Sequence, residues 1–588
     1  MSRKVSRCDK ILTILLLFKC SYADILSVGD VAFNGEASFL VDIVPSNAES
    51  SAVFPHWFVV SLPFACGFLL VVVLTAVLIR VASKRGWVAH PRQDRWSKRT
   101  VAKFGGIPIL LGFSAAMLLG PVTREMLELL LLTWGMALLG LVDDIVGLGP
   151  RSKLLGQITL AGLALSTGVI HHLSGYFWVD AFATIFWIVA ITNAFNLLDN
   201  MDSLAAGIAL LGLVQIGFLA GPDVTAARFA LCMFFAIAGF LPFNINPARI
   251  FMGDTGALAL GFFLACISIK ASAHLYSLAS ALVVPCLVVF VPIFDMLLVS
   301  VTRRANGRPI SLGARDHASH RLALIGLGER QAVGLLCLIA MIAGTMAFLW
   351  ESPWPDLGAG AVGMFVVGAS LFWMYLAELR LPQAWLSSAE FGARVVPEFL
   401  QQRAKRATHI LIDGALIALG LYFAWVITFH HFDGTLWGRF FLVAALSLAV
   451  KMPLLVAFGA YRTSWRAAKS KDLVPILQMS LAAALVLAAA SVVLPQNIFG
   501  WSILLSDMLL TTVFLSVGRA SGLILDGLLA RHRLRLDAGA SVSSPGSSQV
   551  AESAATTQRV SSPDVANGHS ASSEPAAHAS STRVGEVV

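Results

Sequence analysis

Long apolar segments recur along most of this chain, each close to the roughly 20 residues that a helix needs to cross a bilayer. They do not alternate apolar and polar residues as barrel strands do, so helices are predicted. The fold class we predict is an all-α polytopic membrane protein with about eleven helices followed by a four-helix module. The expected spans lie near 57–80, 105–120, 126–142, 154–170, 177–193, 204–220, 227–243, 255–272, 278–301, 332–350, 357–377, 410–430, 440–460, 474–493 and 500–520.

Composition supports a membrane protein. Of the 588 residues, 57% are hydrophobic and 13% are charged, whereas soluble domains carry about 25% charged residues. The net charge of +8 comes from basic residues in short loops between the apolar segments. This arrangement is typical of loops retained in the cytoplasm and argues against nucleic-acid binding.

The polar motifs of the chain fall on one side of the predicted membrane topology. Residues 80–103, the loop after the first span, contain eight basic residues and one acid, so we place this loop in the cytoplasm. Counting spans alternately then places four further loops on the same side, namely 143–153, 193–202, 244–254 and 303–330. All unusual polar clusters are therefore expected at the cytoplasmic surface.

Five segments of the chain are expected. Residues 1–50 contain a short apolar stretch typical of a signal peptide but no clear cleavage site, so a cleaved leader and a mis-assigned start both remain open. Residues 51–377 are expected to form the main membrane domain, 378–404 a cytoplasmic linker and 405–530 the four-helix module. Residues 531–588, rich in Ser and Ala, are expected to be disordered.

Two acidic clusters carry candidate chemistry. Asp143 and Asp144 are adjacent at the end of a predicted span, where carboxylates are costly unless they bind a cation or exchange protons. Asn196, Asp199 and Asp202 follow at three-residue spacing, which places them on one face of a helical end. Hard oxygen ligands in this number suit Mg²⁺. The alternatives are a solvated helix terminus for the first cluster and helix capping for the second.

Two further polar clusters follow. One has a carboxylate close to glycines, and the other is a basic loop. Asp254 lies between two glycines, which permit a close approach of backbone and phosphate, and Phe251 precedes it with a ring suited to stacking on a base. The basic loop after Asp295 suits phosphate binding, although positive loop charge alone would explain Arg303 and Arg304. Its other members are Arg315, His317, His320 and Arg321.

In this order the clusters resemble the polyprenyl-phosphate N-acetylhexosamine-1-phosphate transferase family, of the bacterial glycosyltransferase family 4 type. Its pattern has a DD pair after the third span, an NxxDGxDGLAxG loop, an FNxxPAxxFMGDxGS segment and an HxHHR loop, and the match covers roughly residues 57–377. The chain departs from this pattern at a few positions. Asn200 and Ser203 replace glycines, Ala257 replaces a serine, and the last loop reads His317-Ala318-Ser319-His320-Arg321, with one histidine missing. These departures leave the choice of sugar open.

The resemblance implies an enzyme that transfers an N-acetylhexosamine-1-phosphate from a UDP-sugar to undecaprenyl (polyprenyl) phosphate, using Mg²⁺ or in its place Mn²⁺. The metal ligands implied are Asp254, Asp199 and Asn196. The catalytic residues implied are Asp143, Asp144, Asp199, His317 and His320. The substrate-binding residues implied are Lys153, Asn196, Asp202, Asn244, Phe251, Arg304 and Arg321. The expected setting is a bacterial inner membrane, with the site facing the cytoplasm, in synthesis of a cell-surface glycan such as O-antigen.

Residues 405–530 resemble, more weakly, the four-helix membrane module that precedes nucleotide-sugar dehydratases in polysaccharide biosynthesis. No GxGxxG motif follows it, so no dehydratase activity is expected. The residues Tyr461, Arg462, Trp465 and Arg466 predict either an interfacial belt or a docking surface for a nucleotide-sugar-modifying enzyme. For the whole chain, a lipid-linked-sugar flippase and a membrane scaffold remain the alternative functions, and a covalent aspartyl-phosphate route the alternative mechanism.

Overall fold

The computed structural model describes residues 56–90, 99–221, 223–272, 277–310, 314–352, 355–379, 381, 398–429, 434–461, 473–493 and 500–542. Its elements in the main membrane domain are the helices α2 (His56–Arg85), α3 (Gly106–Leu118), α4 (Arg124–Val146), α5 (Pro150–Leu165), α6 (Phe177–Leu198), α7 (Leu204–Leu219), α8 (Val224–Asn244), α9 (Gly253–Ser272), α10 (Leu278–Val288), α11 (Phe290–Ala305), α12 (Ala318–Leu324), α13 (Glu329–Trp350) and α14 (Pro355–Ala377). The C-terminal helices are α15 (Glu398–Phe429), α16 (Gly434–Ala457), α17 (Val474–Val493) and α18 (Trp501–Val542).

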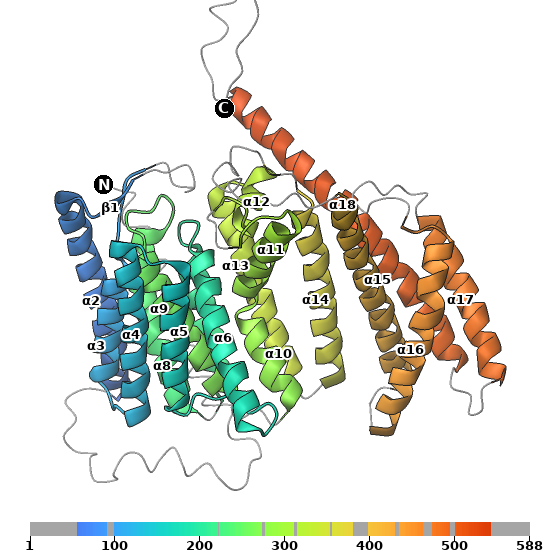
Figure 1. Cartoon of the computed structure of the whole chain (residues 1–588), viewed down its shortest axis with the longest axis horizontal. Helices are drawn as coiled ribbons and strands as arrows, with labels where there is room; N and C mark the ends of the chain where they lie inside the picture. Colours follow the sequence, from blue (N-terminus) through green and yellow to red (C-terminus); the bar gives the residue numbers. More distant parts are fainter. Residues whose placement is uncertain are drawn as a thin grey trace, which may run out of the picture. The chain divides into compact units, whose positions relative to one another are not determined.

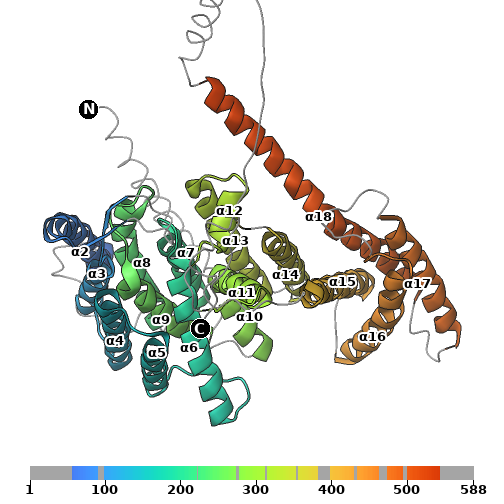
Figure 2. The same ribbon diagram turned by 45° about the horizontal axis from the view of Figure 1, so that its top comes forward.

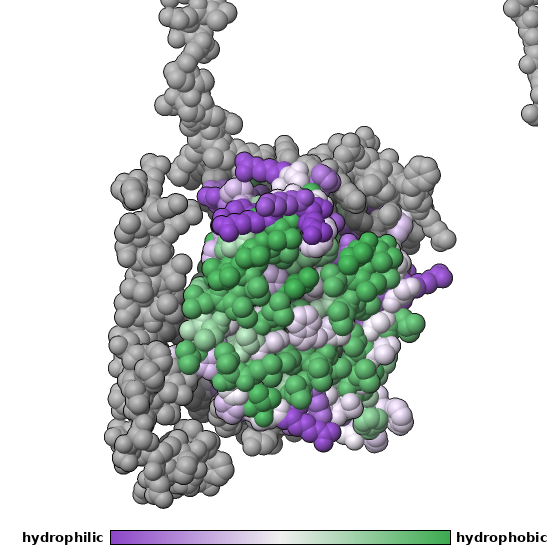
Figure 3. Space-filling model, turned by 90° about the vertical axis from the view of Figure 1, so that its left-hand side faces the viewer, coloured by the Kyte–Doolittle hydropathy of each residue, from purple (hydrophilic) through white to green (hydrophobic). Residues whose placement is uncertain are grey.

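The predicted fold class is confirmed. Within the described residues, eleven helices are long and apolar enough to cross a membrane, or up to twelve if one bent pair counts as a single span. A broad apolar band covers the face of the molecule shown in Figure 3, with hydrophilic residues at its upper edge. Exposed large apolar side chains such as Leu69, Leu131 and Leu138 are suited to contact with lipid tails. The chain is a multi-pass membrane protein.

Several helices are shorter than the thickness of a bilayer, and one predicted span is broken. Helices α3, α5 and α7 have 13, 16 and 16 residues, or about 20–24 Å at 1.5 Å per residue, less than the hydrocarbon core of about 30 Å. The single span expected at 278–301 is interrupted. It is two helices, α10 and α11, bent by 79° at Val289, and Pro292 in the first turn of α11 removes an N–H that a continuous helix would need.

Helix α9 is the core of the main membrane domain. In its most apolar stretch 94% of the residues are buried. The helix packs against α3, α4, α6, α7, α8 and α10. Figures 1 and 2 show it surrounded by its neighbours. Because α9 begins at Gly253, this central helix delivers Asp254 in its first turn to the end of the bundle where the other polar motifs lie.

A short backbone ladder ties the first loop to the third polar cluster. Strands β1 (Val88–Ala89) and β2 (Val101–Ala102) pair antiparallel, and Ala102 forms a parallel bridge with Ile250. The N–H of Phe251 donates to the carbonyl of Ala102 at 2.9 Å. In Figure 1, β1 lies at the same end of the bundle as α12. The chain just before Asp254 is therefore fixed by paired backbone.

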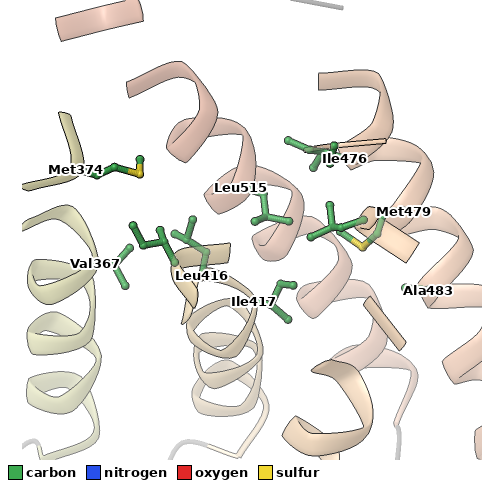
Figure 4. Close-up of a cluster of buried hydrophobic side chains, with 11 residues drawn as sticks. Val367, Met374, Leu416, Ile417, Ile476, Met479, Ala483 and Leu515 are labelled. Carbon is green, nitrogen blue, oxygen red and sulfur yellow. The ribbon is translucent and has the colours of Figure 1, made fainter. Parts of the chain in front are cut away.

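The C-terminal helices α15–α18 form their own apolar core. Helices α14 and α15 pack together, and a buried cluster joins Val367 and Met374 of α14 to residues of the four C-terminal helices. Figure 4 shows this cluster, with Leu416, Ile417, Met479 and Leu515 among its members.

The termini differ from the expectations in one respect. Helix α18 runs through Val542, so the segment expected to be disordered from residue 531 begins as helix, in keeping with the spaced leucines Leu528, Leu529, Leu534 and Leu536. The expected leader (1–50), most of the linker (382–397) and the tail beyond 542 lie outside the described residues.

Candidate active site

A tight connection between α4 and α5 places a carboxylate and a lysine side by side. Helix α4 ends at Gly147, which has a left-handed φ of 75°, and the N–H of Gly147 donates to the carbonyl of Asp143. Gly149 and Pro150 then begin α5, with proline at a position where its missing N–H is harmless. Lys153 in the first turn of α5 therefore turns back toward Asp143.

The ammonium group of Lys153 is the centre of the polar cluster. Its Nζ atom lies 2.8 Å from Oδ2 of Asp143 and donates to Oδ1 of Asn196 at 3.2 Å. It also forms a short ion pair with Oδ2 of Asp254. Three side-chain oxygens from α4, α6 and α9 thus surround one positive charge. We name Asp143, Lys153, Asn196 and Asp254 the Lys153 cluster.

Two glycines allow α4 to approach the start of α9 closely enough to build this cluster. A Cβ atom on Gly140 would lie 2.3 Å from the carbonyl oxygen of Asp254. Gly253 has a φ of +70°, and its Cβ would lie 2.7 Å from Oδ2 of Asp144. That oxygen instead accepts hydrogen bonds from the N–H and the hydroxyl of Thr255, at 2.9 and 2.8 Å. Asp144 therefore holds the first turn of α9, and with it Asp254, in place.

A reciprocal amide pair aligns α5 with α6 beside the cluster. The side-chain nitrogen of Asn193 donates to Gln157 at 2.7 Å, and that of Gln157 donates to Asn193 at 3.3 Å. Gln157 is one helical turn after Lys153, and Asn193 is one turn before Asn196. The pair therefore keeps Lys153 opposite Asn196.

The second and third polar loops are joined by buried hydrogen bonds. Oδ2 of Asp202 accepts from the N–H of Ala248 at 2.8 Å and from Asn246 at 3.1 Å. Oδ1 of Asn244 accepts from the N–H of Ser203 at 3.0 Å. Burial raises the pKa of Asp202 above its ordinary value, and its hydrogen bonds only partly offset this. Asp202 and Asn244 therefore fasten two loops together, and the substrate binding that we predicted for them stays a prediction.

Ser203 stands where the resembled pattern has glycine, and its backbone explains that pattern. Its φ is 65°, a left-handed conformation that costs a non-glycine residue about 1–2 kcal/mol. We expect Ser203→Gly to stabilise the protein by about 0.5–1 kcal/mol and Ser203→Val to destabilise it. Thermal unfolding in detergent measures both, and a less stable glycine variant would contradict the expectation.

A buried carboxylate fixes the histidine loop. Oδ2 of Asp295 lies 2.8 Å from Nδ1 of His317, and its Oδ1 accepts from the N–H of Ala318 at 2.6 Å. Since the Asp295 carboxylate accepts, Nδ1 of His317 is the donor of this hydrogen bond. The rings of His317 and His320 lie 5.6 Å apart. Burial lowers the pKa of His320 to about 3, so His320 is neutral at physiological pH.

Two arginines of this loop act inside the protein. Arg303 forms a bidentate pair with Asp316 at 2.7 and 2.8 Å. Burial raises the pKa of Asp316, but the hydrogen bond and charge of Arg303 outweigh burial, so the pKa lies below its ordinary value. Arg321, 2% exposed, donates to the carbonyls of Asp316 and Leu376 and to Thr302. Both guanidinium groups therefore have partners inside the protein, and substrate binding by Arg321 stays a prediction.

The remaining predicted site residues lie at the same end of the bundle. Asp199 is the C-cap residue of α6, three residues beyond Asn196. Phe251 is half-buried and immediately precedes the first turn of α9, and Arg304 is exposed in the last turn of α11. Both can meet a substrate.

Three supporting residues were absent from our predicted site set. Asp295 orients His317, Asp316 pairs with Arg303, and Glu329 accepts from the N–H of Asp202 at 3.3 Å. Asp316 directly precedes His317 in sequence, which is a signal that could have identified it. Glu329 lies 127 residues from its partner, and no sequence pattern links the two.

The side-chain oxygens of the Lys153 cluster could hold a magnesium ion. Its oxygens come from two carboxylates and one amide, donors that Mg²⁺ prefers. Within the described part of the chain, no group of three or more His, Cys, Asp and Glu side chains is arranged to hold a metal by itself. The donor set therefore fits an ion that keeps waters and takes further ligands from substrate phosphates.

The comparisons with known proteins bear on the same region. Glycosyl transferase family 4 matches residues 126–272, from α4 to α9. A probable undecaprenyl-phosphate N-acetylglucosaminyl 1-phosphate transferase of Bacillus subtilis (strain 168) is 33% identical over 302 residues, which cover 49% of this chain and 84% of that relative. The chain belongs to glycosyl transferase family 4.

A second relative extends the family-4 match. The phospho-N-acetylmuramoyl-pentapeptide-transferase of Staphylococcus aureus (strain Newman) is 29% identical over 313 residues, 48% of this chain and 95% of that relative. Membership in family 4 confirms the transferase part of the resemblance, and the protein is a membrane-embedded transferase. The resemblance of residues 405–530 to a dehydratase membrane module stays a prediction.

Proposed function

We propose that this chain transfers an N-acetylhexosamine-1-phosphate from a UDP-sugar to a polyprenyl phosphate and releases UMP. The observation that carries the proposal is the Lys153 cluster, in which three helices and the first turn of α9 bring charged groups together at one end of the bundle. The two relatives support it, one being a probable undecaprenyl-phosphate N-acetylglucosaminyl 1-phosphate transferase and the other a phospho-N-acetylmuramoyl-pentapeptide-transferase.

The residues of the cluster can hold and orient two phosphorylated substrates. Phosphoryl transfer depends on in-line placement and charge neutralisation, with little covalent help from the protein. Lys153 supplies a positive charge for phosphate, and Asp143 keeps the acceptor phosphate deprotonated or accepts its proton. An oxygen of the polyprenyl phosphate attacks the sugar-linked phosphorus. The bond from that phosphorus to the bridging oxygen breaks, and UMP leaves.

A divalent cation completes the proposed site. Asp254 and Asn196, with Asp199 beside them, would hold Mg²⁺, which when bound neutralises the diphosphate of the donor. Phe251 is placed to stack on the uracil ring. His317 and His320 would contact the diphosphate or sugar. Four other residues would position the site rather than contact the substrates, because their side chains form hydrogen bonds with other protein groups. They are Asp144, Asp202, Asn244 and Arg321.

The test is a reaction with purified protein, polyprenyl phosphate and a panel of UDP-N-acetylhexosamines. We expect UMP release with at least one donor, dependent on both the lipid and Mg²⁺ and abolished by chelator until Mg²⁺ or Mn²⁺ is restored. No UMP with any donor would reject the proposal.

The same reaction separates the alternatives. A flippase would move lipid-linked sugar across proteoliposomes without UMP release, and a scaffold would do neither. A phosphorylated enzyme that accumulates with donor in the absence of lipid would replace the one-step route by a covalent aspartyl phosphate.

The proposed location is a bacterial inner membrane with the site facing the cytoplasm. The acceptor's isoprenoid tail must stay in the bilayer while UDP-sugars are cytosolic, so the reaction belongs at that interface. The polar loops lie at one end of the bundle, as this requires. For the C-terminal module, the interfacial belt and the docking surface for a nucleotide-sugar-modifying enzyme both stay predictions. Their candidate residues Arg462, Trp465 and Arg466 lie outside the described residues.

A further inference from the structure

Two positions at which this chain departs from the resembled pattern touch each other. Asn200 replaces a glycine after α6, and Ser319 occupies the position of the missing histidine in α12. The hydroxyl of Ser319 donates to Oδ1 of Asn200 at 2.6 Å, although 119 residues separate them. Because these two residues are far apart in sequence but in direct contact, we interpret the replacement of glycine by Asn200 and of histidine by Ser319 as one coupled change.

The sizes of the exchanged side chains match. Asparagine adds as many side-chain heavy atoms to the glycine position as serine removes from the histidine position, so the pair conserves volume, the kind of exchange that a packed interior tolerates best. Ser319 is 1% exposed, so its hydroxyl requires a partner inside the protein, and Asn200 supplies it.

The pair joins the two parts of the proposed donor site. The side-chain nitrogen of Asn200 donates to the carbonyl of Leu197 in the last turn of α6, and Asn200 directly follows Asp199. Ser319 lies between His317 and His320 in the sequence, in the loop whose His317 contacts Asp295. The position of the histidine loop is therefore set from the loop that carries Asp199.

We propose that Asn200 and Ser319 form one positioning unit that sets the distance between the histidine loop and the Asp199 loop and thereby selects the sugar of the UDP-sugar donor. This inference rests on the proposed function. A glycine at 200 leaves the hydroxyl of Ser319 without its acceptor, and a histidine at 319 meets the asparagine side chain. Each single exchange therefore disturbs the loop, while the double exchange restores a consistent pair of different shape.

The experiment compares Asn200→Gly, Ser319→His and the double variant with wild type on the donor panel. Each single variant should raise KM for the preferred donor on the order of tenfold, with a smaller change in kcat. The double variant should recover turnover, and its ranking of donors should differ from that of wild type. The control is Ser280→Ala. It removes a different buried serine hydroxyl, which accepts a hydrogen bond from the indole N–H of Trp350 at 3.1 Å, and it should leave the donor ranking unchanged.

The outcomes separate the two proposals. Wild-type turnover combined with additive effects of the single exchanges, or with an unchanged donor ranking in the double variant, would overturn the positioning unit alone. Absence of UMP release by wild type with every donor would reject the proposed function and this inference with it.

Discussion

Asp254→Asn should lower the rate of UMP release about a thousandfold, the loss seen when one preorganised charge-stabilising group is removed. Asparagine keeps the shape of the side chain but removes its charge. Asp254 stands in the first turn of the buried α9 and pairs with Lys153, so no neighbour can move in to replace it. Initial rates at saturating donor and lipid measure the effect.

Asp143→Asn should have an effect of the same order, because it removes the other carboxylate on Lys153. The matched control is Asp223→Asn, at the N-cap of α8, where asparagine caps as well as aspartate. The control should keep wild-type rates, and all three variants should insert into the membrane normally. Wild-type turnover by Asp254→Asn or Asp143→Asn would remove that residue from the site.

Lys451→Met should lower the free energy of unfolding by about 3–5 kcal/mol, the usual cost of leaving one charge of a buried pair without its partner. Nζ of Lys451 in α16 lies 2.7 and 2.6 Å from the two carboxylate oxygens of Asp507 in α18 and 2.9 Å from Thr511. Both charged residues are buried within membrane-spanning helices, where water cannot solvate Asp507 once the lysine is gone.

The matched control removes both charges together. Lys451→Met combined with Asp507→Leu should be close to wild type in stability, since apolar replacement of an entire buried pair is often neutral. Thermal unfolding in the same detergent compares the single and double variants. Equal destabilisation by both would show that the pair contributes by more than mutual neutralisation.

The fold class could be predicted from the sequence because apolar length alone determines whether a helix spans a bilayer. The bend at Val289 could not, since proline also occurs inside α2, α8 and α16, which are long enough to span (Pro63, Pro242 and Pro453). The bounds of the short helices α3 and α7 were predicted to within a few residues, because their apolar stretches are themselves short. The helical start of the expected tail was missed because its Ala and Ser content outweighed its spaced leucines.

The site was predictable in its carboxylates and less so in the roles of its other polar residues. Lys153 was predicted as a phosphate ligand, but only the α4–α5 turn shows that it joins Asp143 to Asp254. Asp202, Asn244 and Arg321 are residue types that often bind substrates, but here their side chains form hydrogen bonds within the protein. Sequence gives the chemical type of such a side chain, while burial and hydrogen-bond partners decide whether it faces a substrate.

The most direct test of the Lys153 cluster is Mn²⁺ binding measured by electron paramagnetic resonance, with UDP present and the detergent-purified full chain. The account predicts one site per chain that is lost in Asp254→Asn, weakened in Asn196→Ala and retained in Asp223→Asn. Equal Mn²⁺ binding by wild type and Asp254→Asn would contradict the claim that these helices converge on one cation.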